Sequence, residues 1–215
     1  MQRKKILLIF DLNGTLLSRN KTSTESLINV VHKFTSNSCK VIVRPFLDEF
    51  FQSVIPDFHV AVWTSCVEKN AAALVKNIGL CCDEFKVENL RFVYARDKCK
   101  LYHRSATELD DKENQPREGK TKFIKPLAVK NLSVVWDDYH GEFDARNTII
   151  VEDSSEKIPQ KENLILVSEF CNEKRFESDR ELVRLREYLA RLFRWYREDL
   201  DIREFLKAVP FNTTS

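Results

Sequence analysis

Short apolar runs alternate along this chain with segments whose apolar residues recur at helical spacing. Five apolar runs predict buried strands, over 5–10, 41–43, 60–63, 133–136 and 147–151. Four periodic segments predict helices, over 25–36, 45–54, 68–78 and 177–208, the third of them closed by Gly79. Strands that alternate with helices predict an α/β fold with a parallel, doubly wound sheet.

Two segments depart from this alternation, because they contain little that a core can bury. Residues 18–24 are polar and predict a loop, and 105–122 predict an exposed loop or a disordered insert. We therefore expect one domain over 1–175 with a flexible insert at about 105–122. A helical extension over 176–215 is expected to pack on the same domain. Its leucine stripe favours a packing helix with a solvated, arginine-rich face over a partner-docking helix.

Composition and charge narrow the function classes. The 215 residues carry 35 Lys and Arg against 33 Asp and Glu, which argues against direct, non-specific binding of nucleic acid. No apolar stretch has the roughly 18–20 residues of a membrane helix, and the run before Asp11 is too short for a secretory signal. The six cysteines form no CxxC pair. We expect reduced thiols and an intracellular location, nuclear or cytoplasmic.

The candidate chemistry begins where the first strand ends, at Asp11-Leu12-Asn13-Gly14-Thr15. A carboxylate, a turn glycine and a hydroxyl directly after a buried strand belong at the carboxyl end of a parallel sheet, where α/β folds bind ligands. The pattern resembles the DxDx(T/V) signature of the haloacid dehalogenase superfamily, in which the first Asp accepts a phosphoryl group. In this chain Asn13 replaces the second Asp.

Further polar residues follow later strands in a consistent order. Thr64 ends the 60–63 run and can donate to a phosphoryl oxygen, and Lys125 can supply a compensating ammonium. Asp153 follows the 147–151 run. Asp11, Asp153 and the backbone carbonyl of Asn13 offer the hard oxygen ligands that Mg²⁺ prefers.

Several blocks resemble the RNA polymerase C-terminal-domain phosphatase-like branch of that superfamily, the FCP1-homology family. The matching blocks are Phe10–Leu16, Val43–Phe50, Val62–Ser65, Phe123–Leu127 leading into Val135-Trp136, and Asn147–Ser154. The resemblance implies a haloacid-dehalogenase-like Rossmannoid fold with a small insertion and no large cap. It also implies Mg²⁺-dependent dephosphorylation of phosphoserine or phosphothreonine in a protein or peptide.

Carried over by position, the resemblance gives each candidate residue a role. Asp11 is the nucleophile, and Asn13 occupies the position of the acid/base. Thr64 and Lys125 bind phosphate. The pair Glu152-Asp153 corresponds to the acidic pair before Mg²⁺, with Asp153 as ligand and Glu152 and Thr15 in support.

Two departures keep the activity open. Glu152 is longer than the Asp of the family pattern, and the amide of Asn13 cannot exchange a proton as the family's acid/base does. A positioned acid/base is worth about 10²–10⁴-fold in rate. Three interpretations remain: turnover falls, water or another side chain moves the proton, or deamidation of Asn13-Gly14 restores the acid in a fraction of molecules.

The leading hypothesis is a protein phosphoserine/phosphothreonine phosphatase with weakened turnover. The alternative is a catalytically inactive pseudophosphatase that binds a phosphopeptide or a protein. The mitochondrial import receptor built on this domain is a precedent for such a binder. A nucleotide or sugar phosphatase ranks third, because no large cap fits between Thr15 and Thr64. The sequence leaves substrate identity and oligomeric state open.

Overall fold

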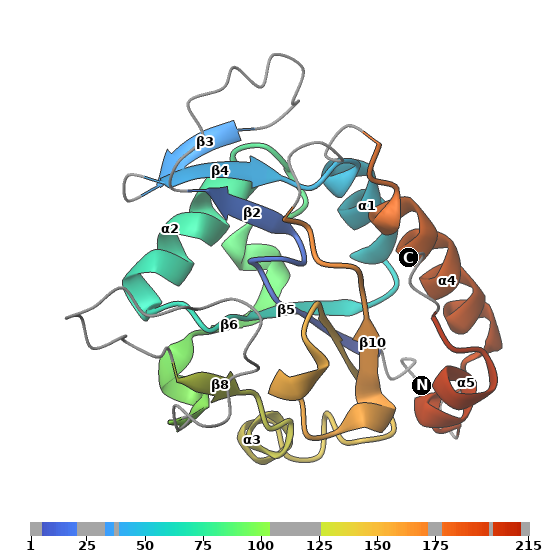
Figure 1. The fold of residues 1–215 in the computed structure, drawn as a ribbon. Helices are drawn as coiled ribbons and strands as arrows, with labels where there is room; N and C mark the ends of the chain where they lie inside the picture. Colours follow the sequence, from blue (N-terminus) through green and yellow to red (C-terminus); the bar gives the residue numbers. More distant parts are fainter. Residues whose placement is uncertain are drawn as a thin grey trace, which may run out of the picture.

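At the centre of the molecule lies a five-stranded, wholly parallel sheet with the order β10-β9-β1-β5-β6 (Figure 1). The computed structural model describes residues 6–20, 33–36, 39–103, 126–171, 178–197 and 200–211. The strands of the sheet are β1 (Leu7–Phe10), β5 (His59–Trp63), β6 (Leu90–Tyr94), β9 (Thr148–Glu152) and β10 (Leu164–Leu166). The strands predicted over 5–10, 60–63 and 147–151 are thereby confirmed.

Helices cover both faces of this sheet, because successive residues of β1 point to opposite sides. Leu8 and Phe10 face a core shared with α1 (Leu47–Val54), α2 (Glu68–Gly79), α4 (Glu181–Trp195) and α5 (Ile202–Ala208). Leu7 and Ile9 face the other side, toward α3 (Ser133–Asp138). The predicted doubly wound fold class is confirmed.

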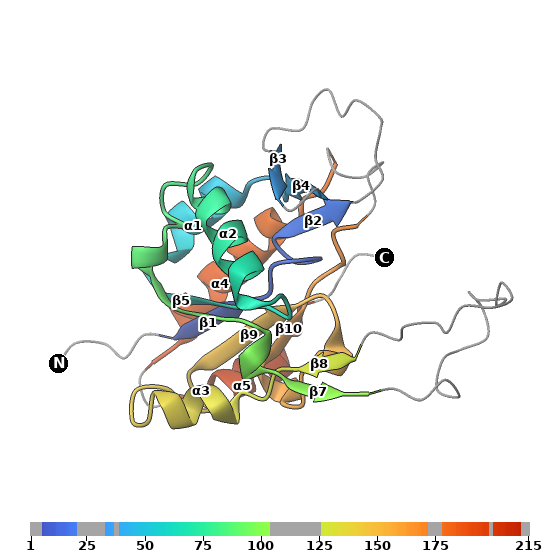
Figure 2. The same ribbon diagram turned by 90° about the vertical axis from the view of Figure 1, so that its left-hand side faces the viewer.

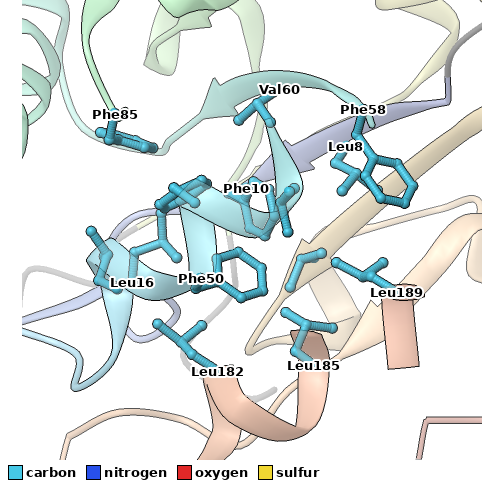
Figure 3. Packing of buried hydrophobic residues seen from close by; sticks show 14 of the residues in the cluster. Leu8, Phe10, Leu16, Phe50, Phe58, Val60, Phe85, Leu182, Leu185 and Leu189 are labelled. Atoms are coloured by element: carbon cyan, nitrogen blue, oxygen red, sulfur yellow. The ribbon is translucent and has the colours of Figure 1, made fainter. Parts of the chain in front are cut away.

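The larger core joins α4 to the central sheet. Figure 3 shows Leu182, Leu185 and Leu189 of α4 directed toward the cluster that contains Phe10 and Phe50. Phe10 makes edge-on ring contacts with Phe50 and Phe51, whose centroids lie 5.7 and 5.4 Å away. The leucine stripe predicted over 177–208 therefore packs into the same core as β1, although the segment forms two helices rather than one.

A second, antiparallel sheet with the order β2-β4-β3 follows β1. Its strands are β2 (Leu17–Asn20), β3 (Lys33–Ser36) and β4 (Cys39–Val43). The helix predicted over 25–36 is wrong at 33–36, and the loop predicted over 18–24 is wrong at 18–20. The backbone of β4 pairs on both sides, with β2 and with β3. Sheet pairing thus overrides the local pattern, and residues 21–32 lie outside the described part.

A two-stranded sheet pairs β7 (Lys100–Tyr102) with β8 (Leu127–Val129). The strand predicted over 133–136 is wrong, because these residues belong to α3. There Asn131 Oδ1 accepts from the Ser133 amide at 3.1 Å and Leu132 and Val135 are buried on one face, as helical spacing requires. The predicted insert at 105–122 lies outside the described residues, so it stays a prediction.

Short 3₁₀ turns connect the larger elements. They are η1 (Val87–Asn89), η2 (Arg96–Lys98), η4 (Ser155–Lys157) and η5 (Lys161–Asn163). The helix predicted from residue 45 begins at Leu47, because Phe46 adopts a left-handed φ of 64°. Among the described residues, no helix combines the length and apolar character needed to cross a membrane.

Candidate active site

Acidic side chains meet at the carboxyl ends of β1 and β9. The two strands pair in register with Phe10 opposite Val151, and the Asp11 amide donates to the Val151 carbonyl at 3.1 Å. This places Asp11 beside Glu152 and Asp153, whose carboxylate oxygens lie within 4.8 Å of one another. Asp11 and Glu152 are buried, and Asp153 is half-buried. The structure therefore brings together the three acids that the sequence singles out.

A buried lysine contacts two of these acids. Lys130 Nζ lies 2.7 Å from Asp11 Oδ1 and 2.6 Å from Glu152 Oε2, and its side chain is fully buried. Lys130 directly follows β8, so a third strand end contributes to the site. Buried charges require such partners, because an isolated ion away from water costs several kcal/mol, on the order of 5.

A second lysine approaches the cluster from η4. Lys157 Nζ lies 2.8 Å from Glu152 Oε1 and 3.5 Å from Asp153 Oδ1. Glu152 therefore holds one ammonium on each of its oxygens. The Glu152 side chain, longer than that of Asp, is fully buried, and its carboxylate lies between the two lysines.

The titration of these groups reflects burial and mutual repulsion. Burial and the neighbouring Glu152 raise the pKa of Asp11, although Lys130 opposes the shift. Burial opposes ionisation of Glu152 too, but Lys130, Asp153 and Lys157 outweigh it and lower its pKa to about 2. Burial and the adjacent Glu152 raise the pKa of Asp153 to about 7. Of the three acids, Asp153 has the longest contact with a lysine, 3.5 Å to Lys157.

These acids fit a magnesium ion. A divalent cation would relieve the repulsion that raises the pKa of Asp153, and all candidate donors are hard oxygens. Asp11, Asp153 and the backbone carbonyl of Asn13 are the groups that would hold it.

Gly14 permits the close approach of Asp153 to the loop after β1. It has a φ of +93°, and an added Cβ would lie 2.6 Å from Asp153 Oδ2. Thr15 Oγ1 donates to Asp153 Oδ1 at 3.5 Å, a long contact. Asn13, between buried Leu12 and buried Gly14, is exposed at the turn. The loop therefore presents the amide to solvent and keeps Thr15 with Asp153.

Thr64 lies at the same edge of the sheet. In the parallel pairing of β1 with β5, Phe10 lies opposite Val62. Asp11 follows Phe10 and Thr64 stands two residues after Val62, so both lie just beyond the paired strands. Thr64 is buried, and its hydroxyl accepts from the Cys66 amide at 3.3 Å. Its hydroxyl proton is therefore available to a ligand at the strand ends.

Comparisons with known proteins show the family of the chain. The chain matches the family model described as NLI interacting factor-like phosphatase over residues 6–201. The chain belongs to this family. The FCP1-homology resemblance of its sequence is thereby confirmed.

Relatives of this NLI interacting factor-like phosphatase domain are distant in sequence. Ubiquitin-like domain-containing CTD phosphatase 1 of Danio rerio is 24% identical over 190 residues, which are 87% of this chain and 50% of the relative. The Xenopus laevis protein of the same name is 23% identical over the same shares. The chain thus spans about half the length of these curated relatives.

A solved structure has the same fold. Fission yeast RNA polymerase II CTD phosphatase Fcp1, bound to beryllium fluoride, superposes with a TM-score of 0.58 at 16% identity, over 91% of this chain and 64% of that one. The likeness supports the haloacid-dehalogenase-like fold, with helices on both faces of a mostly parallel sheet.

The sequence does not predict two residues of this family member's candidate site, Lys130 and Arg44. Lys125, the predicted phosphate-binding lysine, lies outside the described residues, whereas Lys130 occupies the site. The available signal is the position of Lys130, directly after the apolar run 127–129 and the only charge within 127–135.

The second overlooked residue, Arg44, is buried and holds the loop after β1 in place. Its Nη1 donates to the Thr15 carbonyl at 2.9 Å, and its Nη2 donates to the Ser168 carbonyl at 3.0 Å. Nε and Nη2 also bind the Asp179 carboxylate at 3.0 and 2.9 Å. In the sequence, the signal for a buried Arg44 is its position as a cation between the apolar residues Val43 and Phe46.

Proposed function

We propose that the chain is a Mg²⁺-dependent phosphatase of phosphoserine or phosphothreonine in proteins, with Asp11 as the nucleophile. The observation that carries the proposal is the buried Asp11, bound to Lys130 at 2.7 Å within a cluster of acids at the strand ends. Family membership supports the reaction class.

The reaction divides into two displacements. An oxygen of Asp11 attacks phosphorus, the bond to the serine or threonine oxygen breaks, and an aspartyl phosphate forms. Water then attacks phosphorus, which releases inorganic phosphate and regenerates the carboxylate. Bound Mg²⁺ would neutralise phosphoryl oxygens and bring the anionic substrate to the Asp11 carboxylate.

The remaining groups position these atoms. Lys130 orients Asp11 and offers its charge to the phosphoryl group, and the Thr64 hydroxyl donates to a phosphoryl oxygen. The leaving oxygen must gain a proton and the attacking water must lose one. Asn13 can hydrogen-bond to these oxygens but transfers no proton, so solvent carries it and turnover is slow.

The arrangement of the small sheets supports a protein substrate. In Figure 2, β2 and the β7–β8 pair both extend to the side where the central strands end, above and below the loop after β1. Asn13 is exposed in the loop after β1, so an extended chain can reach this loop.

The direct test is Mg²⁺-dependent phosphate release from an aryl phosphate and from a phosphoserine peptide. Wild type should release phosphate faster than Asp11→Asn, which keeps the size of the side chain and removes the nucleophile. Equal rates for the two proteins at saturating Mg²⁺ would refute the enzyme.

Asn13 favours a second candidate, a phosphopeptide-binding domain without turnover. This candidate predicts that wild type binds a phosphoserine peptide more tightly than the unphosphorylated peptide and releases no more phosphate than Asp11→Asn. Calorimetry on both peptides, run beside the release assay, separates the candidates.

A further inference from the structure

Lys157 is part of the acidic cluster, although the mechanism above assigns it no step. Its side chain is 19% exposed and contacts Glu152 and Asp153. Its backbone carbonyl accepts from the Lys130 amide at 2.8 Å, so the two lysines of the site are joined through the main chain as well.

Glu152 fixes the position of Lys157. Its carboxylate is fully buried, with Lys130 at 2.6 Å on one oxygen and Lys157 at 2.8 Å on the other. Removing either ammonium leaves a buried carboxylate less compensated, which opposes departure of the lysine. Lys157 is therefore a fixed charge, unlike an exposed lysine that can turn into solvent.

The charges of the cluster attract a further cation, but Lys157 opposes its binding. Asp11, Glu152 and Asp153 face Lys130 and Lys157, which leaves one net negative charge when all three acids are ionised. Lys157 Nζ stands 3.5 Å from Asp153 Oδ1, an oxygen on a proposed metal ligand. A divalent ion bound to the same carboxylate would be repelled by this ammonium.

We propose that Lys157 is a resident cation of the metal site, which competes electrostatically with Mg²⁺ and lowers its affinity. The proposal rests on the metal-binding role proposed above for Asp11 and Asp153. Lys157 stabilises the arrangement of the acids when no metal is bound, and the same charge limits how tightly metal is held.

Calorimetric titration with Mg²⁺ alone tests the proposal. Lys157→Met should bind Mg²⁺ about tenfold more tightly than wild type, because one unit charge beside the ligands is removed. Lys157→Gln removes the charge but keeps an N–H donor for Glu152, and should behave like Lys157→Met. Lys157→Arg keeps the charge and should stay within about threefold of wild type.

Lys86→Met is the matched control. Lys86 also pairs with a carboxylate, at 3.1 Å from Asp83, but this pair lies on the surface away from the strand ends. Its loss should leave Mg²⁺ affinity unchanged.

Thermal unfolding gives a second readout that needs no activity. In EDTA, Lys157→Met should melt below wild type, because Glu152 loses a counter-ion. Saturating Mg²⁺ should raise the melting temperature of Lys157→Met by more than that of wild type, because a bound cation replaces the missing charge.

The outcomes separate this proposal from the proposed function. If wild type binds Mg²⁺ and folded Lys157→Met and Lys157→Gln bind it equally or more weakly, the resident-cation role is wrong and the metal site stands. If wild type and both variants bind no Mg²⁺, the metal site and the resident cation are refuted together. Tighter binding by both neutral variants, with Lys157→Arg near wild type, supports the proposal.

Discussion

Asp11 can act as a nucleophile only if its charge is tolerated in a buried site. Lys130 provides this tolerance, since it contacts Asp11 and Glu152 at hydrogen-bond distance from a fully buried position. In the proposed mechanism, the same ammonium would lower the nucleophilicity of Asp11 in the absence of substrate. An incoming phosphoryl group would compete for Lys130 and release the carboxylate to attack, so one lysine would serve both pairing and substrate binding.

The first prediction separates Lys130 from Lys125. Lys130→Met should lower kcat/KM by at least about 10²-fold, because it removes the charge beside both nucleophile and phosphate. It should also destabilise the fold by about 3–5 kcal/mol, since two buried carboxylates lose their partner. Urea unfolding and the aryl phosphate assay measure the two effects. A larger loss of kcat/KM in Lys125→Met would restore the original assignment.

The second prediction concerns Asn13. If the missing carboxylate limits turnover, Asn13→Asp should raise kcat by about 10²-fold or more. Mg²⁺ affinity should change by no more than a few-fold, because the backbone carbonyl is retained. Mass spectrometry of the peptide Leu12–Leu16 in wild type controls for deamidated protein. An unchanged rate in a folded, Mg²⁺-binding variant would favour the binding domain.

The third prediction compares two glycines with left-handed backbones. Gly14 and Gly141 have φ of +93° and +82°, but an added Cβ meets Asp153 Oδ2 at 2.6 Å only at Gly14. Gly141→Ala should therefore cost about 1 kcal/mol of backbone strain. Gly14→Ala should cost more and weaken Mg²⁺ binding, because Asp153 must move. Equal Mg²⁺ affinity in both alanine variants would show that Asp153 is not a ligand held by this contact.

At the scale of elements, three segments distant in sequence meet at the loop after β1. Phe170 donates its amide to the Gly14 carbonyl at 2.7 Å, and Arg44 joins the Thr15 carbonyl to Ser168 and Asp179. Asp179 Oδ1 in turn accepts from the Glu181 amide at the start of α4. The loop after β1 is therefore anchored to the start of α4, although this helix does not enter the candidate site.

A fourth prediction tests this anchor. Arg44→Met should destabilise the protein by about 3–5 kcal/mol, because it removes one partner of a largely buried ion pair together with two carbonyl contacts. Arg91→Met removes an exposed pair with Glu142 and should cost at most about 1 kcal/mol. Urea denaturation of both variants gives the comparison. Similar costs would mean that the Arg44 contacts contribute no more than a surface pair.

The local sequence pattern predicts the central elements well, because the apolar residues that define each pattern are the residues that the element buries. The run from Ile6 to Phe10 and the leucines of α4 have this property. The local pattern fails where contacts with residues distant in sequence decide which element forms. Residues 33–36 form a strand through pairing with β4, and Ser133–Trp136 form a helix that covers the sheet.

The same reason explains the candidate site. Asp11, Thr64 and Asp153 follow recognisable strands, so the sequence orders them correctly. Lys130 follows β8, whose strand identity depends on its pairing with β7, and its two acidic partners come from β1 and β9. No local pattern connects these three elements.

For the whole molecule, the acids of the site are an internal source of instability. Asp153 has a raised pKa because it is buried beside Glu152 at the end of the central strand β9. An ionised Asp153 at this strand end therefore opposes folding, because Lys157 at 3.5 Å compensates its burial and the nearby Glu152 only in part. A metal that binds the folded state alone must stabilise the whole fold by linkage.

The last prediction follows from this linkage. At one hundred times its Kd, Mg²⁺ should raise the free energy of unfolding by about 2.7 kcal/mol, which urea titrations with and without EDTA can measure. Asp153→Asn should abolish this increment, because the amide removes the charge that attracts the ion. The same substitution should stabilise the metal-free protein, since the carboxylate repelled by Glu152 is gone. Asp138→Asn, on the exposed side of α3, controls for the loss of one negative charge and should leave the increment intact.

An Asp153→Asn protein that gains as much stability from Mg²⁺ as wild type does would place the ion elsewhere. Loss of the increment together with higher metal-free stability would show that Asp153 weakens the empty fold and gains its stabilising role only with metal.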